Sequence, residues 1–380
     1  MNNFRVDYNN NMYYVVNGQR IYSKIAAIHA ARGDMDKISF HWMEEIWDNV
    51  DWSNEPNEDW YDLLRTRCQQ LRDKYKYLAL WYSSGYDSHT ILRSFVDNNI
   101  LLDELLIYDR GDFFNDPETK FALQHAQYVK ETYYPNLKIN HIKINFKSLA
   151  KFYNDLGEDW IFHPGCSLKP GKTSRYFSTN ITEDFLNHTT KKSDRGDIMG
   201  VDKPKLILRD GKWYVFCPDG STADFIGSKH ENFYITGELP QLHLKQVHKA
   251  INWFDSLPEF NDDILHDVQG RSRVIDGPHK EYFAAWNHAI GRYPMFYSHG
   301  TSINGNIKTF HLTNSEYSPD STSFYEYIKN SDKRTFKIYT QGLVEARKYD
   351  SGTSGSLADK TFIGKQYFVK PQAYQASQAP

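Results

Sequence analysis

A short run of small and polar residues, Ser83-Ser84-Gly85-Tyr86-Asp87-Ser88, has the composition of an anion-binding loop. Small side chains let the backbone approach a ligand closely, and N–H groups at the start of a helix point toward negative charge. The hydroxyls of Ser83 and Ser88 add two further donors. Because a carboxylate needs a cation between itself and an anion, Asp87 predicts Mg²⁺ bound together with a polyphosphate.

The residues on either side of this run predict a strand that leads directly into a helix. Residues 77–82 form a nearly continuous apolar stretch, which is typical of a strand covered on both faces. Apolar residues at 91, 92, 95 and 96 follow helical spacing. The run at 83–88 is therefore predicted to lie at the carboxyl end of a strand, where ligands bind in open α/β sheets.

Two further strands are predicted along the chain, at 105–108 and at 139–144. A helix is expected over 116–132, because Asp116 can cap it and Pro117 suits its first turn. Another helix is expected over 148–156. Strands that alternate with helices of this length predict parallel βαβ units, and hence an α/β fold with a doubly wound, mostly parallel sheet.

Outside this region the sequence predicts smaller elements. Asn17-Gly18 and Asp210-Gly211 favour the tight turns of β-hairpins over 12–22 and 206–216. Helices are also expected from Ser23 to Ala31 and from Asn54 to Tyr75, the second with Pro56 in its first turn, and further helices are expected to open at Pro240 and Pro278. A strand is expected at Ile198–Met199. A flexible loop is expected at 351–356 and a disordered tail after Pro371. Residues 292–335 receive no assignment.

Three regions are predicted: an N-terminal hairpin and helices (1–74), a nucleotide-binding domain (75–235) and a mainly helical C-terminal substrate or cap region (236–380).

Composition narrows the classes of function. The chain has 380 residues and a net charge of −3, so it is not expected to coat nucleic acid non-specifically, although a local basic face stays open. Its apolar runs are too short to predict a membrane span, and its first residues lack the apolar stretch of a signal peptide. We expect a cytoplasmic protein. Cys68, Cys166 and Cys217 form no C-x-x-C pair, which excludes a disulfide scaffold and a four-cysteine zinc site.

The 83–88 run resembles a known family signature. The pattern S-G-G-x-D-S after a strand marks the PP-loop ATP pyrophosphatases, and Ser84 here replaces the first glycine. That family includes the synthetase domain of asparagine synthetase, β-lactam synthetase, GMP synthetase and NAD synthetase, and the 3′-phosphoadenylylsulfate reductases share its fold. Segments 12–30, 65–75, 200–204 and 239–246 also resemble PP-loop proteins of tailed bacteriophages, which are labelled asparagine-synthetase-like or phosphoadenylylsulfate-reductase-like. A phage-encoded protein would work in the host cytoplasm.

The resemblance implies an adenine nucleotide alpha hydrolase-like fold, with ATP and Mg²⁺ as cofactors. Enzymes of the family cut ATP between the α and β phosphates and form an adenylate, which a nitrogen or sulfur nucleophile then resolves. By resemblance, Ser83, Gly85, Asp87 and Ser88 hold the pyrophosphate. The end of the second strand, around Tyr108 and Asp109, is expected to line the adenosine pocket.

Two further groups of charged residues are candidates, one for catalysis together with Asp87 and one for binding a substrate. Asp202 and Lys203 follow Gly200 at the end of a predicted strand, where asparagine synthetase-like enzymes carry a G-x-G-A-D-E segment. Only the glycine and the aspartate match, so a plain charged strand end stays an alternative. The basic side chains at Lys169, Lys172 and Arg175 are expected either to cover an anionic substrate or to form an exposed loop.

The favoured function is an ATP-dependent adenylating ligase that uses a nitrogen nucleophile. Position 2 is Asn and the first cysteine is Cys68, so ammonia or an amine is expected rather than glutamine hydrolysis. A phosphoadenylylsulfate-reductase-like enzyme is an alternative, although such enzymes need a reactive cysteine near the C-terminus and the last one here is Cys217. A second alternative is a phage protein that has the PP-loop scaffold but no catalytic activity. The substrate, a small molecule or a nucleotide, and the oligomeric state are not predicted.

Overall fold

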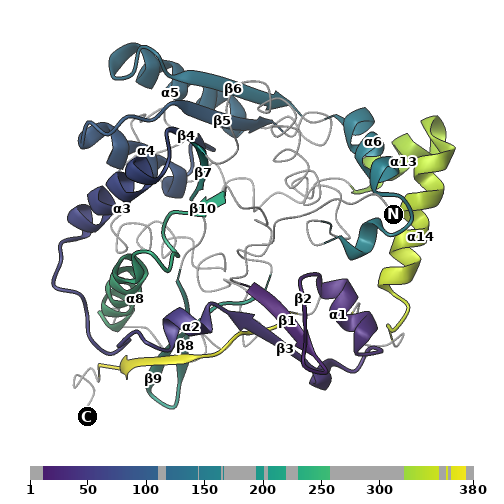
Figure 1. Ribbon diagram of the computed structural model, residues 1–380, viewed down its shortest axis with the longest axis horizontal. Helices are drawn as coiled ribbons and strands as arrows, with labels where there is room; N and C mark the ends of the chain where they lie inside the picture. Colours follow the sequence, from purple (N-terminus) through teal and green to yellow (C-terminus); the bar gives the residue numbers. More distant parts are fainter. Residues whose placement is uncertain are drawn as a thin grey trace, which may run out of the picture.

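The structure is a computed structural model that describes residues 12–109, 117–143, 145–163, 166, 194–200, 204–219, 230–256, 321–350, 357 and 361–373. Figure 1 shows the arrangement of its elements: a parallel sheet flanked by helices, two small antiparallel sheets, and a separate group of helices. Within the described ranges, no helix has the length and apolar character needed to cross a membrane.

The main sheet has five parallel strands in the order β10-β7-β4-β5-β6. Its strands are β4 (Tyr77–Trp81), β5 (Glu104–Asp109), β6 (Lys138–Lys143), β7 (Arg195–Met199) and β10 (His230–Asn232). The chain moves outward from β4 to β6 and then returns to the other side of β4 with β7. This reversal is compatible with a doubly wound α/β fold and confirms the predicted parallel sheet. The point of reversal lies between β4 and β7.

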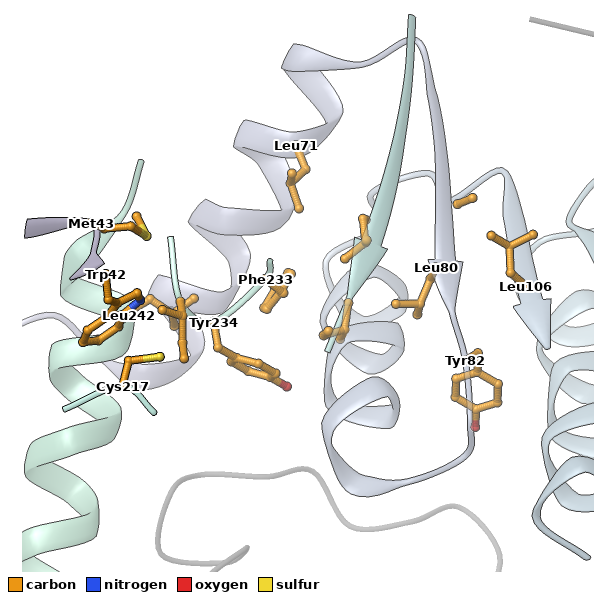
Figure 2. Packing of buried hydrophobic residues seen from close by; sticks show 14 of the residues in the cluster. Trp42, Met43, Leu71, Leu80, Tyr82, Leu106, Cys217, Phe233, Tyr234 and Leu242 are labelled. Carbon is orange, nitrogen blue, oxygen red and sulfur yellow. The ribbon is translucent and has the colours of Figure 1, made fainter. Parts of the chain in front are cut away.

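Three helices accompany the central strands: α3 (Trp60–Lys74), α4 (Tyr86–Asp97) and α5 (Pro117–Thr132). Successive side chains of a strand point to opposite faces, so Leu78, Leu80 and Tyr82 share one face of the sheet. Tyr82 contacts His89 of α4 and His125 of α5, which places both helices over that apolar face. Figure 2 shows Tyr82 beyond Leu80 at the carboxyl end of β4.

The bounds of these helices differ in one respect from those predicted. Helix α5 begins at Pro117 and ends at Thr132, as expected. Helix α3 begins at Trp60 rather than Asn54, so the prediction that Pro56 lies in its first turn was wrong. The physical reason is the cap: the Asp59 side chain accepts a 2.8 Å hydrogen bond from the Tyr61 backbone N–H.

The opposite face of the sheet carries buried charges near the amino ends of its strands. Arg195 of β7 donates hydrogen bonds to Glu104 of β5 at 2.8 Å and to Asp197 at 2.7 Å. All three side chains are buried, and a buried charge is tolerated when it is paired in this way. The network stabilises the strand order at the edge of the sheet remote from residues 83–88.

The N-terminal sheet has the order β2-β1-β3, with β1 (Met12–Val16), β2 (Gln19–Ile21) and β3 (Ile38–Trp42) all antiparallel. It confirms the first predicted hairpin, since Asn17 and Gly18 have φ values of 51° and 77°. Helix α1 (Lys24–Ala30) begins at the expected cap, where Ser23 Oγ accepts from the Ala26 N–H at 3.3 Å. The short elements η1 (Met35–Lys37) and α2 (Glu44–Trp47) flank β3.

The second small sheet has the order β11-β9-β8, from β8 (Lys205–Arg209), β9 (Lys212–Phe216) and β11 (Tyr367–Pro371). Its hairpin turns at Asp210-Gly211 as predicted, whereas β11 was not expected. Asp219 joins this region to the N-terminal sheet. Its carboxylate accepts from the Tyr14 hydroxyl at 2.7 Å and from the Phe362 N–H at 3.0 Å, and it pairs with Lys24 at 2.7 Å.

The remaining described helices are α6 (Phe146–Leu156), η3 (Trp160–Phe162), α8 (Pro240–Asp255), α13 (Ser321–Ser331) and α14 (Lys333–Ala346). Helix α8 opens at Pro240 as predicted, and α6 begins two residues before the expected Ser148. Helices α6, α13 and α14 pack together, with the Trp160 ring stacked on Tyr339 at 5.4 Å. The sequence did not predict α13 or α14. The helix expected at Pro278 and the loop expected at 351–356 lie outside the described residues.

Candidate functional site

The 83–88 loop joins β4 to α4 at the point where the strand order reverses. The Tyr82 N–H donates to the Leu106 carbonyl oxygen at 2.8 Å, which extends the pairing of β4 with β5 up to the loop. Helix α4 then begins at Tyr86, with Gly85 as its cap in an extended conformation. The predicted strand, loop and helix are therefore confirmed, and the loop lies at the edge of the sheet where open α/β folds bind ligands.

Ser84 has an unusual backbone conformation. Its φ of 57° falls in the left-handed region, which glycine adopts without cost and a residue with a Cβ adopts at roughly 1–2 kcal/mol. This is the position at which the resembling signature carries glycine. The backbone at position 84 therefore has a conformation that suits glycine, although the residue there is serine. Ser84 is buried.

Hydrogen bonds inside the loop are long. The Ser83 N–H donates to Ser88 Oγ at 3.2 Å, the Gly85 N–H donates to Ser83 Oγ at 3.4 Å, and the two serine hydroxyl oxygens lie 3.3 Å apart. Typical N–H···O and O–H···O bonds are shorter, with modes near 2.9 and 2.7 Å. These donors can therefore turn toward an anion and give up only weak internal bonds. Ser83, Gly85 and Ser88 are brought together as the sequence predicted.

The first turn of α4 is held by two neighbouring strand ends. The Tyr234 hydroxyl, which follows β10, donates to the Asp87 carbonyl oxygen at 2.8 Å. Gly200, which follows β7, lies so close that a Cβ at its position would be 3.1 Å from Ser88 N and 3.2 Å from Asp87 C. The start of the predicted second loop therefore touches the 83–88 loop. Its candidate residues Asp202 and Lys203 lie outside the described residues.

The end of β5 lies at the same edge of the sheet. Trp81 pairs with Leu106, so Tyr108 and Asp109 extend past the last paired residue of β4 and lie beside the start of the loop. Their side chains point to opposite faces of the sheet. The Asp109 carboxylate lies within hydrogen-bonding distance of His141 Nε2 of β6, at 2.8 Å. The structure thus brings Tyr108 and Asp109 to the expected edge.

The environments of Cys68 and Cys166 are poorly suited to redox chemistry. Cys68, Cys166 and Cys217 form no disulfide, and burial raises the pKa of the Cys68 and Cys166 thiols above the ordinary value. A raised pKa disfavours the reactive thiolate. In the described part of the chain, no group of three His, Cys, Asp or Glu side chains is placed to hold a metal ion. Lys169, Lys172 and Arg175 fall outside that part.

Two tyrosines at this site were missed by sequence reasoning. Tyr234 reaches Asp87 across 147 residues of chain, and Tyr82 contacts His125 across 43. Figure 2 shows Tyr234 extending from the end of β10 toward the side of the sheet on which α4 lies. Neither contact could be predicted from the spacing of residues along the chain. The only hint is that Tyr82 ends the apolar run immediately before the loop.

No protein-family model matches the chain, and no curated protein matches it either. What the chain does is therefore inferred from the 83–88 loop and from the elements that hold it.

Proposed function

We propose that the chain is an ATP-dependent adenylating ligase of the PP-loop type, which forms AMP and pyrophosphate. It activates an acid or carbonyl oxygen of its substrate for attack by a nitrogen nucleophile. The observation that carries the proposal is the 83–88 loop itself. It joins a buried parallel strand to a helix at the point of strand reversal, and its Ser84 backbone is left-handed where the family signature has glycine.

The residues present fit Mg²⁺ and a polyphosphate. The loop offers two hydroxyls and the N–H groups at the start of α4, a helix of 12 residues, and these favour negative charge. Asp87 in the first turn supplies one carboxylate. Magnesium in nucleotide sites is typically bound by one or two carboxylates together with substrate phosphates, so one carboxylate beside the phosphates suffices. When bound, Mg²⁺ would neutralise charge on the departing pyrophosphate.

The chain's own residues would then act mainly by positioning and by stabilising charge. In the proposal, Ser83, Gly85 and Ser88 hold the β and γ phosphates. Tyr108 and Asp109, beside the loop, line the adenosine pocket. Asp202 and Lys203 follow the glycine that touches α4 and supply further charge near the pyrophosphate. Lys169, Lys172 and Arg175 are proposed to contact an anionic substrate.

A second candidate is a nucleotide-binding protein without catalysis. It is favoured by one observation, the Cβ of Ser84, which stands where the family's glycine lets the backbone approach phosphate most closely. The reductase alternative is less consistent with the structure, because Cys68 and Cys217 are buried and the pKa of the Cys166 thiol is raised by burial.

Product analysis with ATP labelled at the α phosphate tests the proposal. The protein is incubated with Mg²⁺ and a panel of acids, nucleotides and amine donors. Labelled AMP together with equimolar pyrophosphate is expected for the wild type and lost in Asp87→Asn. Asp97→Asn, at the other end of α4 and paired with Arg93, is the matched control. ADP as the main product would contradict the proposal, and nucleotide binding without turnover across the panel would favour the second candidate.

A further inference from the structure

A buried cluster of three side chains lies directly beneath the 83–88 loop. Tyr82 precedes the loop, His89 follows it in the first turn of α4, and His125 comes from α5. All three are at most 3% exposed. The Tyr82 hydroxyl contacts His125 Nδ1 closely and lies 3.3 Å from His89 Nδ1, and the two imidazole rings are 5.0 Å apart. The Tyr82 hydroxyl therefore contacts both His89, which follows the loop, and His125 of a second helix.

The tautomers of the two imidazoles determine the direction of these hydrogen bonds. A phenol has one proton to donate, so it donates to one imidazole and accepts from the other. Burial, and secondarily the nearby Arg93, lowers the pKa of His125 to about 4, so its ring is neutral at pH 7 and Nδ1 can accept. In the tautomer in which His125 Nδ1 accepts from the Tyr82 hydroxyl, the His89 Nδ1–H donates to the tyrosine oxygen. Tyr82, His89, Arg93 and Tyr128 are among the groups that face His125.

The 83–88 loop needs contacts from outside itself to keep its shape when it binds an anion. Its internal hydrogen bonds are 3.2–3.4 Å long, and Ser83 and Ser88 would turn their hydroxyls outward toward an anion. When those bonds are given up, the close contact of the Tyr82 hydroxyl with His125 still holds the start of the loop against α5, and its 3.3 Å contact with His89 lies inside the buried cluster.

We propose that Tyr82 and His125 are positioning residues that hold the 83–88 loop in its anion-binding shape, through the hydrogen-bonded chain from His89 to Tyr82 to His125. This inference rests on the proposed function for its ligand, ATP, but the shape of the loop can be measured without one. Tyr82 and His125 touch no phosphate in this account. They act through the backbone on either side of the loop.

The test compares matched tyrosine variants. Tyr82→Phe removes the linking hydroxyl. Tyr134→Phe is the control, because it removes a half-buried hydroxyl that donates to the Ile100 carbonyl oxygen at 2.9 Å, away from the loop. Amide hydrogen exchange of a peptide covering residues 83–90 is measured without ligand, and Mg-ATP affinity is measured by calorimetry. Tyr82→Phe is expected to raise exchange in that peptide and to weaken Mg-ATP about tenfold, whereas Tyr134→Phe changes neither.

Replacing His125 distinguishes positioning from general packing. Asn can place an oxygen acceptor near the position of Nδ1, whereas Gln places its polar atoms near Nε2. His125→Asn is therefore expected to keep slow exchange and tight binding, and His125→Gln to lose both. Equal behaviour of Asn and Gln, or unchanged exchange in Tyr82→Phe, would overturn the positioning role. If the wild type shows no Mg-ATP binding, only the proposed function is overturned. The exchange comparison still tests whether Tyr82 and His125 position the loop.

Discussion

The hydroxyl of Tyr234 donates a 2.8 Å hydrogen bond to the carbonyl oxygen of Asp87, joining the end of β10 to the first turn of α4. Tyr234 is fully buried. The bond fixes the turn whose N–H groups would face a bound anion. It therefore links the strand order of the sheet to the geometry of the candidate site.

Tyr234→Phe should weaken Mg-ATP binding by disturbing this turn. Loss of one hydrogen bond is also expected to lower the free energy of unfolding by about 1 kcal/mol. Tyr367→Phe is the control, since its hydroxyl donates to Asp48 at 2.8 Å far from the loop. Denaturant unfolding and calorimetric titration measure the two effects. Equal nucleotide affinity in the two variants would show that Tyr234 matters only for stability.

Ser84→Gly should stabilise the protein and strengthen nucleotide binding. Relief of the left-handed backbone is worth roughly 1–2 kcal/mol, and the greater freedom of glycine in the unfolded chain offsets about 0.5–1 kcal/mol of that. The lost Cβ also leaves room for phosphate. Ser94→Gly, in the interior of α4, should instead cost about 1 kcal/mol. Weaker binding by Ser84→Gly would mean that the serine side chain itself contacts the ligand.

Gly200→Ala should impair the site through close contact with backbone. The new Cβ would stand 3.0 Å from Ile91 Cδ1 and 3.1 Å from Ser88 N, so α4 must shift. Overpacking of this kind typically costs about 1–3 kcal/mol. Gly364→Ala is the comparison, because its Cβ would also meet a backbone atom closely, the Cys217 carbonyl oxygen at 3.3 Å, but away from the loop. Melting temperature and Mg-ATP affinity should both fall for Gly200→Ala, and an unaltered affinity would count against a shared site.

Acid should destabilise the protein partly through His125. Its folded-state pKa is about 4, below the ordinary 6.5 of the unfolded chain, so the unfolded state binds more protons as pH falls between these values. The free energy of unfolding should therefore drop by roughly 2–3 kcal/mol from pH 7 to pH 4.5 on account of this group. His125→Asn should show a correspondingly shallower decline. His163→Asn should act similarly, because burial also lowers the pKa of His163 to about 4. Parallel curves for wild type and His125→Asn would contradict the assignment.

Local signals in the sequence predicted much of the fold. The turns at Asn17-Gly18 and Asp210-Gly211 were found because positive φ favours these residues, and Pro117 and Pro240 marked helix starts. The 83–88 loop was found because its small residues follow an apolar strand. In each case the determining interaction lies within a few residues of the chain.

The misses have a different physical origin. Helix α3 was placed too early because Pro56 and Asp59 both suit a helix start, and only the cap geometry decides between them. Strand β11 pairs with β9, more than 150 residues away in sequence, so its partner leaves no local pattern. The contacts of Tyr234 with Asp87 and of Tyr82 with His125 are likewise long-range, and the spacing of residues along the chain does not encode them.

The most direct test of the central claim is calorimetric titration of the full chain with ATP, with and without Mg²⁺, in the wild type and in Asp87→Ala. The account predicts Mg²⁺-dependent binding by the wild type and by Asp97→Ala. It predicts loss of that binding in Asp87→Ala, with an unfolding transition close to that of the wild type. Equal affinity in Asp87→Ala, or no binding by the wild type, would contradict the assignment of the 83–88 loop as the nucleotide site.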